Sequence, residues 1–313
     1  MRSHDVVIIG GGISGLTSAY QLKKNNISFK LLESSSRLGG AIETVVKEDF
    51  IYEKGPNTFL LSDKRIFNLF NELKLEIQDA SPISNNRYVL KNKKCVKVPM
   101  SFLSFLSTPL FSVSTKLRII FEFLNNSKSC SNEESVAEFI KRRFNKQVLD
   151  YAINPFIAGT YAGDPDKLSI KHSFPMLYNF ENEKGSITKG MLSNKKSEFK
   201  LNRRSISFKN GLSDLILKLQ EILKQYINIH SKVTNISKEN KLFSITYSYG
   251  EEIKTIYAKN IICTIPTPAL KTIKFNNENS HHFDKLSSIY YPPILSVTIA
   301  LKKNDIAEKF DGF

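Results

Sequence analysis

The chain has 313 residues, of which 41% are hydrophobic and 11% aromatic, so it can bury a large core, most economically in two domains. Its 45 basic and 30 acidic residues give a formal net charge of +15 at pH 7, without a long basic run or a nucleic-acid motif. We therefore expect no nucleic-acid partner. We interpret the excess as a solvated basic surface, which leaves room for an anionic substrate or lipid.

The cysteines and the ends of the chain bear on its compartment. Cys95, Cys130 and Cys263 are far apart and form no CxxC or metal-ligand cluster, which predicts a reduced intracellular protein without disulfides or a metal site. The N-terminus enters the first apolar stretch without a signal peptide, and no segment reaches the roughly 18 uninterrupted apolar residues of a membrane span. We expect cytoplasmic localisation, or a peripheral position on the inner face of the membrane.

The first forty residues carry the most informative pattern. Residues 6–9 (Val-Val-Ile-Ile) are apolar without alternation, which is typical of a buried parallel strand. Gly10 allows a tight turn out of this strand, Gly12 lets a pyrophosphate approach the backbone, and Gly15 lets the next helix pack tightly on the sheet. That helix, residues 14–25, points its N-terminal amides and positive dipole end at the phosphates. The loop predicts a bound dinucleotide.

The residues that follow the loop indicate which dinucleotide it is. A second strand, residues 28–32, delivers Glu33 at the spacing needed to accept hydrogen bonds from a ribose, and a carboxylate there disfavours NADP. Arg37 then adds positive charge near the phosphates, while Gly39 and Gly40 let the chain pass close to the cofactor. The sequence has one glycine fingerprint and no redox dithiol, which argues against a second NAD domain and a disulfide reductase. These features predict FAD and redox chemistry.

The pattern is less regular beyond residue 50. A sharp turn at 55–59 leads into an amphipathic helix that opens at Ser62 and Asp63 and ends near Leu73. Residues 96–124 are rich in Phe, Leu, Ile and Ser. They form either buried helices of a second domain or an apolar surface that meets a membrane or lines a channel for an apolar substrate. The sequence leaves these two alternatives open.

The second half of the chain returns to a strand-rich pattern. The capping box Ser131-x-x-Glu134 predicts a helix through Val148, and the polar, basic residues 179–205 are expected to form a loop. A helix is predicted after Gly211. The expected strands that follow it cover residues 232–236, 243–249, 253–258 and 260–265. This pattern predicts that the chain re-enters the dinucleotide domain.

We therefore predict an α/β fold with interleaved domains. A Rossmann-like FAD-binding domain would comprise residues 1–78 and 206–275 and accompany an α+β substrate domain. Residues 79–205 would form a helical subdomain, membrane-associating if its apolar surface is exposed. Residues 276–313 would begin a returning, incomplete segment of the substrate domain.

Several runs outside the FAD motif carry a family resemblance. The most specific is Asn154-Pro155-Phe156-Ile157-Ala158-Gly159-Thr160-Tyr161-Ala162-Gly163-Asp164-Pro165. The others are Gly55-Pro56-Asn57-Thr58-Phe59, Asn86-Arg87-Tyr88, Gly185-Ser186-Ile187, Ser207-Phe208-Lys209-Asn210-Gly211-Leu212 and Tyr291-Pro292-Pro293. With these runs, essentially the whole chain resembles the protoporphyrinogen oxidase family, which has coproporphyrinogen-oxidising relatives and lies in the amine-oxidase superfamily.

The resemblance implies FAD as the cofactor and assigns residues to it. Those that would hold FAD are Gly10, Gly11, Gly12, Ile13, Ser14, Gly15, Glu33, Ser34, Arg37, Gly40, Ala41, Gly55, Pro56, Asn57, Thr58 and Val233. Residues 55–58 would pass beside the isoalloxazine ring, and the backbone of Val233 would meet the adenine. Arg87 would bind a substrate propionate through its bidentate guanidinium, and Gly159 would line the substrate site. Asn57 is the candidate catalytic residue, orienting substrate or flavin.

The implied reaction removes six electrons from protoporphyrinogen IX in three hydride transfers to the flavin, with dioxygen as the oxidant and hydrogen peroxide as the product. The alternatives are coproporphyrinogen III as substrate, an amine oxidase or carotenoid desaturase, or a non-catalytic binding protein of the same fold. A homodimer and peripheral membrane association stay open. Because the family pattern continues beyond Phe313, we also expect a C-terminally truncated chain whose own activity is a separate question.

Overall fold

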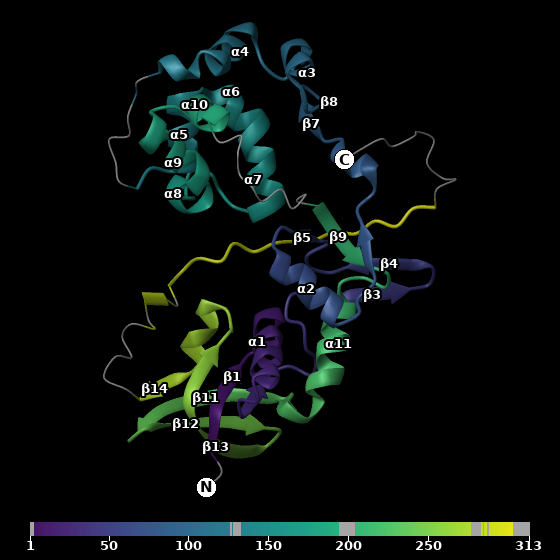
Figure 1. The fold of residues 1–313 in the computed structure, drawn as a ribbon, viewed down its shortest axis with the longest axis vertical. Helices are drawn as coiled ribbons and strands as arrows, with labels where there is room; N and C mark the ends of the chain where they lie inside the picture. The colour runs from purple at the N-terminus through teal and green to yellow at the C-terminus, as the bar shows by residue number, and fades with distance from the viewer. Residues whose placement is uncertain are drawn as a thin grey trace. The chain divides into compact units, whose positions relative to one another are not determined.

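The computed structural model describes residues 3–125, 127, 133–193, 204–276, 283, 285–286 and 288–302. The chain forms two compact units (Figure 1). The first contains residues 1–80 and 201–300, and the second contains residues 81–200 with 301–313. The first unit is therefore assembled from two segments that are separated in sequence by the second unit.

A seven-stranded sheet in the order β10-β2-β1-β13-β12-β11-β14 forms the centre of the first unit. Its strands are β1 (Ser3–Ile9), β2 (Phe29–Leu32), β10 (Ile227–Asn228), β11 (Ser231–Glu239), β12 (Leu242–Tyr249), β13 (Glu252–Cys263) and β14 (Lys274–Asn276). β1 runs parallel to both β2 and β13, and β2 runs parallel to β10. β12 is antiparallel to β11 and β13, whereas the edge strand β14 runs parallel to β11, so the sheet is mixed.

The apolar run of β1 is buried because the sheet is covered on both faces. Val6 and Ile8 lie in one hydrophobic core, whereas Val7 and Ile9 lie in another. Successive side chains of a strand point to opposite faces, so a strand covered on both faces needs an unbroken apolar run. The expected buried parallel strand and the α/β fold class are both confirmed.

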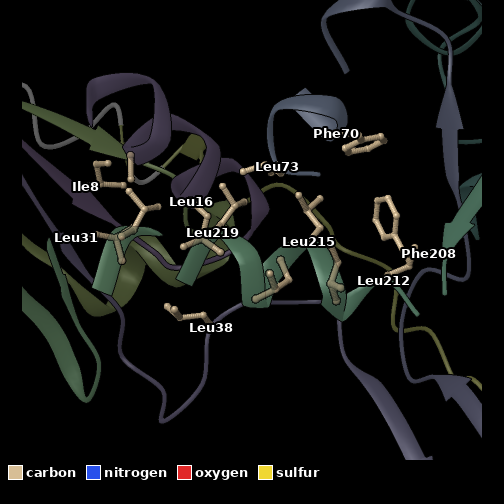
Figure 2. Close-up of a cluster of buried hydrophobic side chains, with 14 of the residues drawn as sticks. Ile8, Leu16, Leu31, Leu38, Phe70, Leu73, Phe208, Leu212, Leu215 and Leu219 are labelled. Atoms are coloured by element: carbon tan, nitrogen blue, oxygen red, sulfur yellow. The ribbon is translucent and has the colours of Figure 1, made fainter. Parts of the chain in front are cut away.

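Helices α1 (Ile13–Lys24) and α11 (Ser213–Leu223) cover the face to which Val6 and Ile8 belong. Figure 2 shows Leu16 of α1 together with Leu215 and Leu219 of α11 in this core. All three side chains are at most 1% exposed. Full burial of such a side chain contributes about 1.5–3 kcal/mol, so this contact ties the N-terminal segment to the returning one.

Short elements complete the first unit. They are β3 (Thr44–Lys47) with β4 (Phe50–Glu53), the sheet β5 (Phe59–Leu61)–β9 (Arg204–Phe208)–β6 (Ile77–Asp79), α2 (Lys64–Glu72), and the 3-10 turns η4 (Lys224–Tyr226) and η5 (Thr267–Thr272). Asp63 caps α2 by accepting a hydrogen bond from the Arg65 amide at 2.7 Å, as the predicted start of this helix requires. Phe70 of α2 meets Phe208 of β9 edge-on, with ring centroids 5.1 Å apart, which again joins the two segments (Figure 2).

The second unit is mainly helical. Its elements are η1 (Pro82–Asn85), β7 (Tyr88–Lys91), β8 (Lys94–Lys97), α3 (Phe102–Ser107), α4 (Val113–Ile120), η2 (Glu122–Leu124), α5 (Val136–Arg143), α6 (Lys146–Val148), the π-helix η3 (Leu149–Ile153), α7 (Asn154–Tyr161), α8 (Ile170–Ser173), α9 (Pro175–Lys184) and α10 (Ile187–Ser193). Val136, Phe139 and Ile140 of α5 are at most 1% exposed and form the centre of its core. Within the described ranges, no helix combines the length and apolarity needed to span a bilayer.

The apolar segment 96–124 agrees in part with each of the two predicted alternatives, buried helices and an exposed apolar surface. Leu110 and Phe111 are buried in the core of the second unit. On the flanking helices, by contrast, Phe102 and Leu103 of α3 are 65% and 78% exposed, and Val113 of α4 is 72% exposed. The segment therefore contributes to the core and also presents an apolar surface.

Three sequence predictions were wrong in detail. Residues 179–184 and 187–193 are helical, in α9 and α10, where a loop was predicted. Buried Phe180 of α9 packs so closely on Gly190 of α10 that a Cβ there would lie 2.3 Å from the ring. The capping box of α5 is formed by Ser135 and Glu138; Ser131 lies outside the described residues. The strands expected at 253–258 and 260–265 are one strand, β13, because its first half pairs with β12 and its second half with β1.

The core of the second unit holds a buried ion pair between Arg143 of α5 and Glu122 of η2, both only 1% exposed. Arg143 also donates to the carbonyl oxygens of Asn125 at 2.7 Å and Gly185 at 3.1 Å. The Glu122 carboxylate accepts from the Ser186 hydroxyl at 2.7 Å and from the amide of Thr188, in the first turn of α10, at 3.0 Å. The pair thus connects α5, η2 and α10.

Candidate functional site: a dinucleotide cradle

The turn between β1 and α1 shows why three of its positions are glycine. Gly10 has φ +105°, which side-chain-bearing residues rarely adopt. A Cβ on Gly15 would lie 2.0 Å from the Gly10 carbonyl oxygen, so the helix approaches the strand end as closely as a glycine permits. A Cβ on Gly12, in contrast, would meet nothing within 4 Å. The turn and the close packing need Gly10 and Gly15, whereas Gly12 leaves an open space beside the backbone.

That open space lies at the N-terminus of α1. Gly12 is the N-cap residue, and among the residues that the structure describes no side chain caps the first turn of the helix. Ile13 is partly buried against the core and Ser14 is exposed, so the first turn is anchored on one side and open on the other. Uncapped amides with the positive end of a helix dipole bind phosphate oxygens. Gly12 and the first turn of α1 thus form a cradle that fits the pyrophosphate of a dinucleotide.

Glu33 follows β2 and is bound on both carboxylate oxygens. Oε2 accepts from the Gly11 amide at 2.6 Å, and Oε1 accepts from the Ser35 amide at 2.7 Å and from the hydroxyls of Ser35 and Ser34 at 2.8 Å and 3.3 Å. Partial burial alone would raise the pKa of Glu33, but these hydrogen bonds outweigh it and lower the pKa. An ionised carboxylate therefore lies against the glycine loop, where it suits ribose hydroxyls.

The 37–42 turn lies directly against the glycine loop. The Gly39 amide donates to the Gly11 carbonyl oxygen at 2.9 Å, and a Cβ on Gly40 would lie 3.3 Å from the Gly12 Cα. The Arg37 guanidinium donates to the carbonyl oxygens of Leu38, Gly40 and Ile42 at 3.2, 2.7 and 3.2 Å, and pairs with Glu43 at 3.1 Å. Arg37 thus holds the shape of this turn, and its proximity to the cofactor phosphates stays a prediction.

The predicted flavin-side segment, residues 55–58, joins the same turn. A Cβ on Gly55 would lie 2.0 Å from the Ala41 carbonyl oxygen, so only glycine permits this approach. Pro56, Asn57 and Thr58 follow outside any helix or strand and are exposed. The exposed segment is thereby fixed at Gly55, next to the turn that borders the pyrophosphate cradle.

Val233 lies near the other end of the cradle. The Glu33 amide donates to the Asn228 carbonyl oxygen at 2.8 Å, and the Ser231 amide donates to the Glu33 carbonyl oxygen at 2.7 Å, so the start of β11 runs beside Glu33. Val233 is two residues further along β11, at a position where the pairing with β12 is irregular. The structure therefore brings the predicted adenine-side and ribose-side residues together.

Comparison with known proteins identifies the family. The model of the family described as "Flavin containing amine oxidoreductase" matches residues 13–309. The chain belongs to the flavin-containing amine oxidoreductase family. FAD, predicted from the glycine loop, is the cofactor of this flavin-containing family.

Individual members of the family are similar over most of the chain. It is 32% identical to protoporphyrinogen oxidase 2 of Arabidopsis thaliana, over 98% of this chain and 66% of the relative. It is also 32% identical to coproporphyrinogen III oxidase of Bacillus subtilis, over 84% of this chain and 60% of the relative. The chain thus spans only 60–66% of the length of these two relatives.

Solved structures of the family show the same fold. A candidate protoporphyrinogen oxidase from Exiguobacterium superposes with a TM-score of 0.69 at 24% identity, covering 87% of this chain and 62% of that one. Putrescine oxidase superposes with a TM-score of 0.65 at 16% identity, covering 90% of this chain and 62% of that one. At these identities the superpositions establish the fold alone.

The two predicted substrate residues lie in the second unit. Arg87 immediately precedes β7, is exposed, and accepts a hydrogen bond from the Val98 amide on its carbonyl oxygen at 2.8 Å. Gly159 lies on α7 and is exposed, and a Cβ there would meet nothing within 4 Å. α7 directly follows the π-helix η3, a feature that is frequent at functional sites. His281, His282 and Cys130 lie outside the described residues.

Sequence reasoning expected Gly39 to let the chain pass close to the cofactor but did not predict its bond to Gly11, and it assigned no role to Ser35 or Thr264. Gly39 bonds Gly11, and Ser35 gives Glu33 two hydrogen bonds. Thr264, at the end of β13, bonds the carbonyl oxygens of Ile9 and Gly10. The three serines after Glu33 were a usable signal for Ser35, because serine favours such local bonds. Nothing local marks Thr264, because its partners are at the opposite end of the sequence.

Replacing Glu33 with glutamine is expected to destabilise the first unit by about 1–3 kcal/mol, because an amide group would face the donors of Gly11 or Ser35. A carboxyl whose pKa is lowered on folding stabilises the protein above its unfolded pKa, near 4.5, and ceases to do so as the pH falls through the folded value. The difference in free energy of unfolding between wild type and Glu33→Gln should therefore be complete at pH 7 and become smaller below about pH 4.5. Urea unfolding followed by circular dichroism measures it, with exposed Glu251→Gln as the matched control. A free-energy difference that grows as the pH falls would contradict this account.

Proposed function

We propose that the chain oxidises a porphyrinogen to the corresponding porphyrin, with FAD as the electron acceptor and dioxygen as the final oxidant. Protoporphyrinogen IX is the proposed substrate and coproporphyrinogen III is the alternative. One observation carries the proposal: relatives named as oxidases of these two porphyrinogens are 32% identical to this chain, whereas putrescine oxidase is 16% identical.

The reaction balances as one porphyrinogen and three dioxygen giving one porphyrin and three hydrogen peroxide. Bound FAD supplies the acceptor for a hydride and a route for two electrons to dioxygen. In this proposal the α1 amides beside Gly12 hold the pyrophosphate, Glu33 holds the ribose, and Val233 meets the adenine. Residues 55–58 fix the edge of the flavin site, with Asn57 orienting substrate or flavin.

Arg87 and Gly159 are the proposed substrate residues. A guanidinium pairs with a carboxylate through two parallel hydrogen bonds, and the propionates of a porphyrinogen offer that group. Replacing Arg87 with alanine is expected to raise KM about tenfold, equivalent to about 1.4 kcal/mol, with a smaller change in kcat because the arginine binds substrate away from the reacting carbon. Arg87→Lys should recover part of the affinity, whereas exposed Lys171→Ala should leave KM unchanged. An equal fall in kcat with unchanged KM would contradict the role.

Porphyrin fluorescence distinguishes the substrates. The FAD-loaded chain is mixed in parallel with protoporphyrinogen IX, coproporphyrinogen III and putrescine, and porphyrin and hydrogen peroxide are measured. The proposal expects porphyrin with three equivalents of peroxide from one porphyrinogen and no peroxide from putrescine. Peroxide formed from putrescine, without porphyrin from either porphyrinogen, would favour the amine-oxidase alternative.

The exposed apolar residues of α3 and α4 support a second, peripheral role. Phe102, Leu103 and Val113 lie on this surface, and Lys116 and Arg118 of α4 add the positive charge that anionic headgroups attract. We propose that the second unit binds the membrane surface through it. Co-sedimentation with vesicles containing anionic lipid should be lost in Phe102→Ser/Leu103→Ser and kept in a surface variant such as Lys171→Ala.

Sedimentation velocity of the same sample without vesicles distinguishes a monomer from a homodimer.

A further inference from the structure

We propose that Thr264 is a positioning residue for the FAD pyrophosphate. It immediately follows β13, the neighbour of β1 on the side opposite β2. Its backbone amide donates to the Ile9 carbonyl oxygen at 2.9 Å. Its hydroxyl lies 3.0 Å from the Ile9 carbonyl oxygen and 3.1 Å from the Gly10 carbonyl oxygen, and donates toward both. Thr264 thus contacts the backbone of the turn from which the cradle starts.

The contacts of Thr264 complete a clamp on two successive peptide groups. In the Ile9–Gly10 peptide, the oxygen is bound by Thr264 and the amide donates to the Leu32 carbonyl oxygen at 2.9 Å. In the Gly10–Gly11 peptide, the oxygen is bound by the Thr264 hydroxyl and the amide donates to Glu33 at 2.6 Å. Because a peptide group is planar, bonds at both of its ends fix its orientation. The hydroxyl is therefore one of the two groups that fix the peptide immediately before the cradle.

The glycine pattern itself leaves the space in which this hydroxyl lies. A Cβ on Gly10 would lie 2.8 Å from Thr264 Oγ1, and a Cβ on Gly15 would lie 3.0 Å from it. Gly10 and Gly15 thus serve Thr264 as well as the turn and the helix packing. Thr264 and these glycines form one structural unit, although they come from opposite ends of the first unit's sequence.

Loss of the hydroxyl would free one end of the Gly10–Gly11 peptide. Gly10 has the wide conformational freedom of glycine, so this peptide can rotate once it is held only by Glu33. Rotation would move Gly12 and the first amides of α1, which must converge on the phosphate oxygens. We therefore expect FAD affinity, rather than the fold, to depend on the hydroxyl.

The test compares Thr264→Val, which keeps the shape and removes the hydroxyl, with Thr264→Ser, which keeps the hydroxyl. The dissociation constant for FAD is measured by quenching of flavin fluorescence, and thermal unfolding of the apoprotein is measured alongside. We expect Thr264→Val to weaken FAD binding about tenfold and Thr264→Ser to stay within about twofold of wild type. Thr272→Val is the matched control, because its hydroxyl also donates to a backbone carbonyl, that of Ala269 at 2.8 Å, away from the cradle.

The proposal is overturned if Thr264→Val binds FAD as tightly as wild type, or if Thr264→Ser loses as much affinity as Thr264→Val. It is also overturned if the apoprotein of Thr264→Val is destabilised as much as its FAD binding is weakened, because the role would then be structural. The inference rests on the assignment of FAD to this cradle. A wild-type chain that does not bind FAD would refute that assignment, whereas tight binding by wild type and Thr264→Val alike would refute the role of Thr264 alone.

Discussion

Replacement of Gly12 by alanine is expected to weaken FAD binding at least about tenfold while leaving the apoprotein folded. The added Cβ would meet nothing within 4 Å in the protein, so the fold has room for it. It would instead occupy the space beside the uncapped N-terminus of α1, where the pyrophosphate is expected. The backbone at Gly12 is extended, with φ −71° and ψ −179°, which any residue adopts, so strain is not expected.

Gly15→Ala is the matched comparison for Gly12→Ala. Its Cβ would lie 2.0 Å from the Gly10 carbonyl oxygen, so helix and strand must separate, at a cost of about 1–3 kcal/mol. Gly15→Ala should therefore lose both stability and FAD, whereas Gly12→Ala should lose FAD alone. Gly12→Ser distinguishes the effect of capping α1 from the effect of filling the space beside its N-terminus, because serine is a better N-cap than alanine but fills the same space. Equal FAD affinity in wild type, Gly12→Ala and Gly12→Ser would show that the pyrophosphate does not lie at Gly12.

Replacement of Arg143 by methionine is expected to destabilise the second unit by about 3–5 kcal/mol, because Glu122 would remain as an unpaired buried charge. The amides of α5 and α10 report this locally. Their hydrogen exchange should accelerate about a hundredfold or more, since 1.4 kcal/mol corresponds to a factor of ten. The exposed pair Lys146–Asp150, 2.5 Å apart, provides the control, and Lys146→Met should change exchange by less than about fivefold.

Lowering the pH should also destabilise the part of the second unit around Glu122. Burial by itself would raise the pKa of Glu122, but hydrogen bonds from Thr188, Ser186 and Arg143 outweigh it and lower the pKa to about 2. The stabilisation is therefore complete above the ordinary value of 4.5 and is lost as the pH falls toward about 2. Exchange of the α10 amides in wild type, corrected for the intrinsic pH dependence, should accelerate over that range. An unchanged corrected rate between pH 5 and pH 2.5 would contradict the assignment.

The cradle was predictable from sequence where its parts are close together in the chain. Gly10, Gly12, Gly15 and Glu33 have the spacing that a strand, a turn, a helix and a second strand impose, and their geometry is compatible with the roles predicted for them. The apolar run of residues 6–9 likewise indicated a strand covered on both faces, because alternation disappears only when neither face meets water.

Other features of the cradle and of the second unit could not be predicted, because they depend on contacts between residues that are far apart in sequence. Thr264 follows an ordinary apolar strand, and only the fold shows that its hydroxyl meets Ile9 and Gly10. Arg143 ends a run of three cations that resembles a solvated helix end, yet it is 1% exposed because Glu122 approaches from another element. The helical residues 179–184 and 187–193 escaped prediction because few apolar side chains, such as Phe180, anchor them in an otherwise polar sequence.

The most direct measurement of the central claim is anaerobic reduction of the bound flavin. The FAD-loaded chain is mixed without dioxygen with protoporphyrinogen IX, coproporphyrinogen III or putrescine, and the yellow flavin absorbance is followed. We expect one of the two porphyrinogens to bleach it, dioxygen to restore the colour, and putrescine to leave it unchanged. Bleaching by putrescine alone, or flavin that neither porphyrinogen reduces, would contradict the account.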